Sequence, residues 1–242
     1  MYILAIETTG AFASAAVTDG SRILAHIQGS DRFSHLQNLM PQVQQVIEES
    51  GLSIGDIDAI AVSVGPGSFT GIRIGVSSAR GLAKILKVPC IPVSSLQALA
   101  MRESANQGTL ICPMLDARRS QVYAGGYLIE EGGAVEAVKA GPYTLEEFLN
   151  AVKEYDSILI MGDAADVYGT RIAELRTEGI STASEDTRYQ HADTVALMGA
   201  ALLAQGEAVS YEELKPDYMR IPEAERKLKE QKAAAGKGGQ EK

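Results

Sequence analysis

Residues 63–86, SVGPGSFTGIRIGVSSARGLAKIL, follow the order of a phosphate-binding loop. A predicted strand leads into a Gly-Pro-Gly turn and then into a predicted helix, and the N-terminus of such a helix is a ready anion site. The spacing, however, does not match the known nucleotide fingerprints. Gly65, Gly67 and Gly71 are one residue too widely spaced for G-x-G-x-x-G. A Walker loop has lysine after its last glycine, whereas Ile72 stands there in this chain.

Acidic and hydroxyl side chains stand at the ends of two predicted strands. Glu7, Thr8 and Thr9 follow the first strand, and Asp116 ends a similar strand in the second half. Two acids facing one cleft would suit acid–base chemistry or a metal-bound phosphate. The phosphate hairpin of sugar kinases and actins begins D-x-G-T, but this chain reads ETTG, so weak or absent nucleotide binding is expected. The nucleotide candidates are Glu7, Thr8, Thr9, Gly65 and Gly67.

Histidines are few and do not show a metal-binding spacing. The chain contains His26, His35 and His191, with no H-x-x-x-H pair and no cysteine pair at metal-ligand spacing. His35 is followed four residues later by Leu39, which cannot bind a metal. The sequence therefore predicts no metal site and no catalytic residue.

The elements that position these residues begin with a predicted three-stranded meander over residues 2–28. A helix is predicted over 34–50, with Ser34 as N-cap and Gln37 completing a capping box. Its apolar residues recur at helical spacing, and Gly51 ends it. A strand buried on both faces is predicted over 57–64, followed by the helix of the glycine stretch.

The second half of the chain repeats this order. A strand ending in Asp116, a second strand and a third strand over 133–141 form another meander. A helix over 144–152, a strand, and helices over 166–175 and 194–205 follow. The pattern predicts two similar α/β halves that arose by internal duplication.

The helix over 68–87 is apolar over an unusually wide arc. Only a narrow stripe is strongly polar: Arg73, Ser77, Arg80, Lys84 and Lys87. Such a helix is usually covered on more than one side, and the small residues Gly71, Gly75 and Ser78 would allow a second helix to approach. Two interpretations stay open: the first helix of this chain supplies the cover, or the two helices also form a docking surface for another subunit.

Composition excludes several classes of protein. The chain has 242 residues, 45% of them hydrophobic and 22% charged, as in an ordinary globular protein. Its net charge of −9 disfavours direct nucleic-acid binding by the chain as a whole. No signal peptide and no membrane span are expected, and Cys90 and Cys112 are expected to be buried, reduced thiols, so a cytoplasmic location is predicted.

Several motifs together resemble the bacterial TsaB family, formerly called YeaZ. These are MYILAIETTGAFASAAV, SHLQNLMP, SVGPGSFTGIRIGVSSARGLA, LDARRSQVYAGGY and KPDYMRIPEA, spread over about residues 1–222. The resemblance implies the duplicated two-lobe fold of the actin, sugar-kinase and Hsp70 (ASKHA) superfamily, with a mixed sheet and helices in each lobe. We expect lobes over 1–104 and 105–210, a segment over 211–230 that packs back on the body, and a disordered tail over 231–242.

The same resemblance implies a function as an accessory subunit rather than as an enzyme. TsaB proteins are partners of TsaD, which transfers a threonylcarbamoyl group to the adenosine next to the anticodon of ANN-decoding tRNAs, and TsaE joins the complex. The expected TsaD interface is a helical bundle built on helices 34–50 and 68–87, and these helices are also expected to pair two copies when TsaD is absent. Transfer RNA would be contacted through the complex. The expected interface residues are His35, Leu36, Leu39, Met40, Val43, Gly71, Ile72, Arg73, Gly75, Val76, Ala79 and Arg80.

Other functions stay open at this point. A small ASKHA-type ATPase or kinase would use Glu7, Thr8, Thr9 and the Gly65–Gly67 loop. A metallopeptidase-like protein is disfavoured by the single His35 where TsaD-type proteins have H-x-x-x-H. No cofactor is expected, apart from ATP or ADP at the partner interface.

Overall fold

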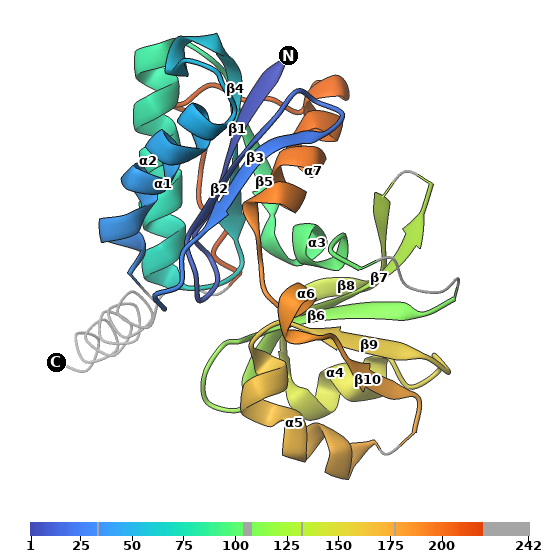
Figure 1. Cartoon of the computed structure of the whole chain (residues 1–242). Coiled ribbons are helices and arrows are strands. Elements are labelled where there is room, and N and C mark those ends of the chain that lie inside the picture. The colour runs from blue at the N-terminus through green and yellow to red at the C-terminus, as the bar shows by residue number, and fades with distance from the viewer. Residues whose placement is uncertain (33, 104–107, 132, 177, 220–242) are drawn as a thin grey trace, which may run out of the picture.

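The computed structural model describes residues 1–32, 34–103, 108–131, 133–176 and 178–219, and it shows two lobes joined by two crossings of the chain (Figure 1). The predicted tail over 231–242, and the last part of the segment predicted over 211–230, lie outside the described residues. Among the described residues, no helix is long and apolar enough to span a membrane.

The first lobe is built on a five-stranded mixed sheet in the order β3-β2-β1-β4-β5. Strands β1, β2 and β3 form the predicted antiparallel meander, while β4 and β5 run parallel to β1. Their bounds are Tyr2–Glu7, Ser14–Thr18, Ile23–Gln28, Ile57–Gly65 and Cys90–Ser94. As predicted, β4 is buried along nearly its whole length.

The second lobe repeats this arrangement. Its sheet has the order β8-β7-β6-β9-β10, so the first strand of each meander lies in the centre and the parallel strands continue from it. The bounds of β6 to β10 are Leu110–Asp116, Gln121–Glu130, Gly133–Thr144, Ile158–Met161 and Ile180–Thr182. The identical strand order confirms the predicted division into two similar α/β lobes, each with a mixed sheet and helices.

Helices α1 (His35–Glu49) and α2 (Phe69–Leu86) cover one face of the first sheet, and α7 (Ala192–Ala204) covers the other (Figure 1). The predicted second lobe, residues 105–210, is wrong at its C-terminal end, because α7 lies within that range but packs on the first lobe. Its buried alanine, valine and methionine side chains pack on β1, β2 and β5. Gly199 permits this approach, since a Cβ there would lie 2.6 Å from the Cβ of Ala61 on β4.

The second sheet is covered by α4 (Leu145–Ala151) and α5 (Ala164–Leu175) on one face and by α3 (Ser95–Ala100) on the other. Helix α3 therefore lies between the two sheets. The short helices η1 (Ile54–Asp56) and α6 (Glu185–Arg188) complete the described elements.

Capping explains where several of these helices begin. Ser68 caps α2, because the backbone N–H of Gly71 donates to its hydroxyl at 3.2 Å. Thr144 and Glu147 form a capping box at the start of α4. The capping box predicted at Ser34 is wrong: the Ser34 side chain makes no capping hydrogen bond, and its backbone oxygen instead accepts from the N–H of Asn38.

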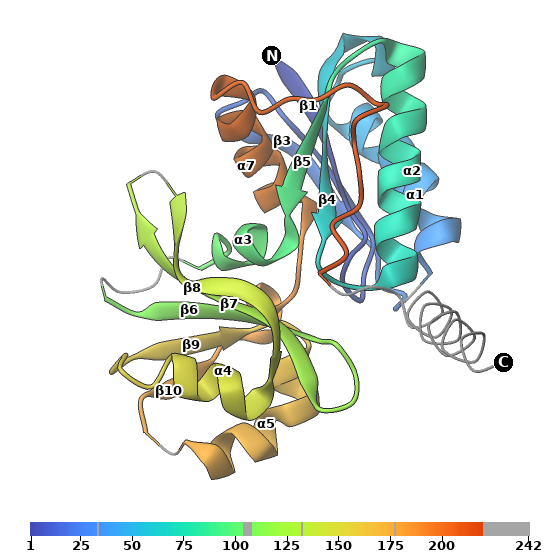
Figure 2. The ribbon, with the colours of Figure 1, turned by 180° about the vertical axis from the view of Figure 1, so that it is seen from behind.

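The chain after α7 returns along the first lobe beside α2 (Figure 2). Val209 pairs with Cys90 at the edge of the sheet, and Leu214 is fully buried in the core beneath α1 and α2. The N–H of Asp217 donates to the oxygen of Val64 at 2.8 Å, next to the glycine loop. Both cysteines, Cys90 and Cys112, are free and buried, as predicted.

Candidate functional site

The glycine loop between β4 and α2 packs tightly against the connection between β1 and β2. The N–H of Ser68 donates to the oxygen of Thr9 at 2.8 Å, and the hydroxyl of Thr8 donates to the oxygen of Gly71 at 2.7 Å. Gly67 has φ +152°, and a Cβ there would lie 2.5 Å from the Thr9 oxygen. Gly67 is therefore required for this backbone-to-backbone contact.

Glu7 lies below this contact and does not face a cleft. Its side chain is fully buried, accepts from the hydroxyl of Thr9 at 2.6 Å, and also accepts from the Thr9 N–H and the Ser63 hydroxyl. Glu7 and Asp116 therefore do not face one cleft as a pair of acids. Burial raises the pKa of the Glu7 carboxyl above 4.5, and the hydrogen bonds from Ser63 and Thr9 only partly oppose that rise.

Replacing Glu7 with glutamine should reveal this buried acid in the pH dependence of stability. Because the folded-state pKa lies above the unfolded value near 4.5, the folded protein loses stability as pH rises from that value through the raised pKa. Glutamine does not titrate, so the Glu7→Gln variant does not lose stability in this way. The unfolding free energy of the variant minus that of the wild type should therefore increase as the pH rises from about 4.5 through the raised pKa, by at most about 1.4 kcal/mol per pH unit. Chemical denaturation over a pH series measures it. A difference that falls with rising pH would contradict the expected direction.

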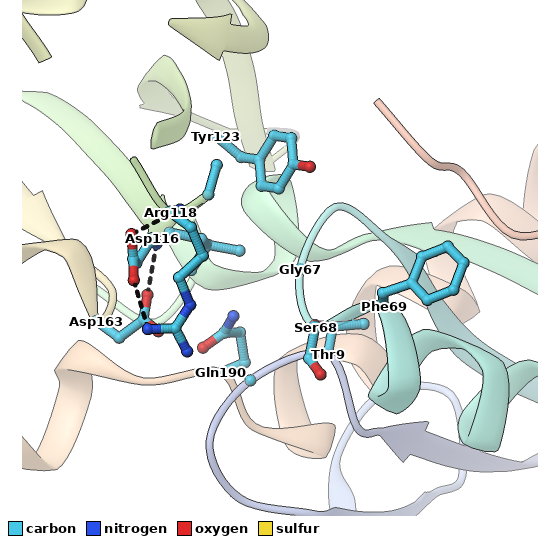
Figure 3. A pocket seen from close by; sticks show the side chains of 12 residues that line it. Thr9, Gly67, Ser68, Phe69, Asp116, Arg118, Tyr123, Asp163 and Gln190 are labelled. Atoms are coloured by element: carbon cyan, nitrogen blue, oxygen red, sulfur yellow. Dashed lines mark hydrogen bonds and ion pairs between the residues drawn. The ribbon is translucent and has the colours of Figure 1, made fainter. Parts of the chain in front are cut away.

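A cleft of about 290 Å³ opens between the lobes (Figure 3). The first lobe contributes the ends of the β1–β2 connection and of the glycine loop, and the second contributes the ends of β6 and β9. Its volume lies at the lower limit of roughly 300–1,000 Å³ typical of small-molecule sites. The lining residues are Thr9, Gly10, Gly67, Ser68, Phe69, Leu115, Asp116, Ala117, Arg118, Tyr123, Asp163 and Gln190.

The charged groups of this cleft are largely bonded to one another (Figure 3). Asp116 accepts from the backbone N–H of Arg118 at 2.8 Å and from the hydroxyl of Tyr168 at 2.9 Å, and it pairs with the Arg118 guanidinium at 3.2 Å. Asp163 accepts from the backbone N–H of Asp116 at 2.9 Å. Burial, followed by the charge of Asp116, raises the pKa of Asp163. These bonds stabilise the wall of the second lobe, while the Arg118 side chain itself is 81% exposed.

Of the predicted nucleotide candidates, only Thr9 and Gly67 line this cleft. Glu7, Thr8 and Gly65 are buried behind it, so they cannot contact a ligand there. Sequence reasoning missed Asp163 and Gln190. The signal for Asp163 was available, because it follows the fourth strand of the second half just as the glycine loop follows the fourth strand of the first. No local sequence pattern around Gln190 indicates that it lines the cleft.

The twelve expected interface residues divide into two groups. Eight are buried by this chain itself, so the prediction that they form a contact surface is wrong for them. They are His35, Leu39, Val43, Gly71, Ile72, Gly75, Val76 and Ala79. Four side chains face outward: Leu36 and Met40 on α1, and Arg73 and Arg80 on α2.

The small residues of α2 accept this chain's own loop rather than a neighbouring helix. A Cβ on Gly71 would overlap the carbonyl oxygen of Thr8, and a Cβ on Gly75 would overlap the Thr8 hydroxyl. Similarly, His35 turns inward at the start of α1, where its Nε2 lies 3.0 Å from the oxygen of Gly10.

The outward face of α1 and α2 still carries long apolar side chains. Leu36 is 74% exposed, Met40 42% and Ile85, near the end of α2, 77%. Sequence reasoning left Ile85 out, although its helical position beside Leu82 marked it as part of the second apolar face. On the same helix, Arg73 packs its guanidinium 3.9 Å from the Phe69 ring and donates to the Tyr218 hydroxyl at 3.1 Å. We name the exposed Leu36, Met40 and Ile85 the outer apolar face.

Comparison with protein families gives one match that covers most of the chain. The model described as TsaD, tRNA N6-adenosine threonylcarbamoyltransferase, matches residues 23–227.

Individual relatives are similar over nearly their whole length. The chain is 34% identical to the tRNA threonylcarbamoyladenosine biosynthesis protein TsaB of Bacillus subtilis, over 94% of this chain and 97% of that protein. It is 31% identical to the protein of the same name from Escherichia coli, over 94% of this chain and 98% of that protein. Among solved structures, YeaZ from Pseudomonas aeruginosa superimposes with a TM-score of 0.76 at 27% identity, covering 90% of this chain and 99% of that chain.

Proposed function

Because the chain belongs to the TsaB (YeaZ) family, whose role lies in tRNA threonylcarbamoyladenosine biosynthesis, we propose that it binds and organises the TsaD transferase as a non-catalytic subunit. In this proposal TsaD carries out the transfer to the adenosine next to the anticodon of ANN-decoding tRNAs, and TsaE joins the complex. Transfer RNA contacts the complex mainly through the partners, since this chain carries a net charge of −9. The proposed location is the cytoplasm, where the tRNA is.

The observation that carries the proposal is the outer apolar face. Leu36 and Met40 extend from the first turns of α1, and Ile85 extends from α2, so both helices present apolar side chains on the side away from their own sheet. Contiguous exposed apolar patches mark protein–protein contacts, and Leu36 and Met40, four residues apart on α1, form such a patch. We propose that the α1 and α2 pair packs there on helices of TsaD, and that the same face pairs two copies of this chain when TsaD is absent.

The hydrogen bonds of Glu7 and Ser68 support an organising rather than a catalytic role. Glu7 is enclosed and fully bonded, and the Ser68 hydroxyl is used to cap α2. Accordingly, we propose that this chain by itself binds no cofactor and that ATP or ADP binds only at its interface with TsaD.

Reconstitution with and without this chain tests the function. TsaD and TsaE from the same genome, the threonylcarbamoyl adenylate and unmodified tRNA are combined, and the modified nucleoside is measured by mass spectrometry after nuclease digestion. We expect product only when both TsaD and this chain are present. Full modification without this chain would contradict its requirement, and product formed by this chain without TsaD would contradict a non-catalytic role. ATP turnover by the isolated chain would instead favour the ATPase or kinase alternative.

A further inference from the structure

Two of the three histidines meet in the structure, and neither of them lines the cleft or belongs to the outer apolar face. His26 lies on the edge strand β3, and His191 immediately precedes α7. Their rings stack with centroids 5.2 Å apart and planes 28° apart. Asp193, in the first turn of α7, completes a cluster in which one potential ligand atom from each residue lies within 4.8 Å of the others.

We propose that His26, His191 and Asp193 bind a divalent transition-metal ion of the zinc class, at the junction between the two lobes. Two imidazole nitrogens and one carboxylate oxygen suit Zn²⁺ and its neighbours, whereas Mg²⁺ and Ca²⁺ prefer oxygen ligands alone. With three protein ligands, water would complete a tetrahedral site.

An unsatisfied nitrogen supports this assignment. Nε2 of His26 is buried and has no hydrogen-bond partner among the described residues. Leaving a buried polar atom unpaired is unfavourable, and a metal ion at this nitrogen would remove that cost.

The positive charge nearest the cluster leaves one oxygen of Asp193 available. Arg102 lies 3.1 Å from Oδ1 of Asp193, and this oxygen also accepts from the N–H of Thr194 at 2.7 Å. Oδ2 receives only a longer contact of 3.4 Å from Arg102. A carboxylate oxygen has two lone pairs, so Oδ2 can bind a metal while Arg102 remains hydrogen-bonded to Oδ1 and keeps the carboxylate in place.

The required movement is small. Zinc ligands at about 2.0–2.2 Å from the ion lie roughly 3.3–3.6 Å from each other in a tetrahedral site. The three residues are only partly buried, so their side chains can close on the ion by rotation, and water can reach it.

The position of the site indicates what the ion would do. The chain crosses from the first lobe to the second after α3 and returns before α7. Arg102 connects both crossings, because it also donates to the backbone oxygens of Asp186 at 2.8 Å and Thr187 at 3.2 Å. A metal bound by His26, His191 and Asp193 would fix the end of the second crossing, where α7 begins, to the edge of the first sheet.

Metal titration of the full chain tests this site. The chelator-treated protein is titrated with Zn²⁺ in competition with a chromophoric chelator, and we expect one ion per chain. His26→Ala and His191→Ala should each weaken binding by at least about 100-fold, because loss of a ligand costs more than the roughly 10–100-fold lost with a group that only supports a ligand. His35→Ala is the matched control, since it removes the remaining histidine, and it should leave the affinity unchanged.

Two further measurements distinguish metal binding at this site from metal binding elsewhere on the chain. Co²⁺ should give a visible spectrum without a thiolate charge-transfer band, which excludes ligation by Cys90 or Cys112. Zn²⁺ should raise the melting temperature of the wild type and of His35→Ala but not of the other two variants. Absence of stoichiometric binding, or wild-type affinity in His26→Ala or His191→Ala, would overturn the proposal and leave the two rings as a packing contact.

Discussion

Gly71→Ala should destabilise the protein by about 3 kcal/mol or more, whereas Gly81→Ala on the same helix should stabilise it by about 0.5–1 kcal/mol. At Gly71 the added methyl group would overlap the carbonyl oxygen of Thr8 and lie 3.0 Å from its carbon. Both obstacles are backbone atoms, which cannot move without separating α2 from the β1–β2 connection. At Gly81 the added methyl group would have no neighbour within 4 Å, so only the higher helix propensity of alanine would change the unfolding free energy.

Thermal unfolding measures both changes. For a chain of this size 1 kcal/mol corresponds to about 2–4 °C in melting temperature, so Gly71→Ala should melt at least about 6 °C below the wild type. Gly81→Ala should melt at or above the wild type. Shifts of the same sign and size in the two variants would contradict the close contact between α2 and Thr8.

The double variant Leu36→Glu, Met40→Glu should lose TsaD binding while keeping its fold. Leu36 is 74% and Met40 42% exposed, so carboxylates there remain in water in the free chain. Leu36 is the second residue of α1, where a negative charge interacts favourably with the helix dipole. In a complex the same charges would be buried against apolar helices of TsaD without a partner. We expect both side chains to be hot-spot contacts, whose loss costs about 2 kcal/mol each or more, so the affinity should fall by roughly 1,000-fold.

Co-purification with tagged TsaD, followed by calorimetry, measures this loss. Val167→Glu is the matched control, because Val167 is 55% exposed but lies on α5 of the second lobe. It should bind TsaD normally. Unchanged binding by the double variant, or an equal loss with Val167→Glu, would show that the outer apolar face is not the TsaD interface. The same double variant should elute as a monomer if this face also pairs two copies.

Much of the fold could be predicted, because its signals are local. Apolar residues at helical spacing placed the first two helices within one residue of their observed bounds, 35–49 and 69–86. The repeated order of meander, helix and strand indicated two duplicated halves, and the observed sheets have the same strand order. Short motifs over most of the chain indicated the family.

The candidate sites were predicted less well, because they depend on which side of an element is covered. Gly71 and Gly75 mark a place of close approach, but the sequence does not say that Thr8 occupies it. The assignment of α7 to the second lobe was wrong for a similar reason. A helix that is apolar on all sides does not indicate in its sequence which sheet it covers, and in the structure α7 packs on the first sheet.

By itself, therefore, the sequence determined the elements, their duplication and the family, since periodicity, turn residues and motifs act within a few residues of one another. Only the tertiary structure decided that Glu7 is enclosed, that Leu36 and Met40 rather than the glycines face outward, and that His26 meets His191. These outcomes depend on contacts between segments distant in the chain. Such contacts are selected by the packing and desolvation of the whole fold rather than by any local pattern.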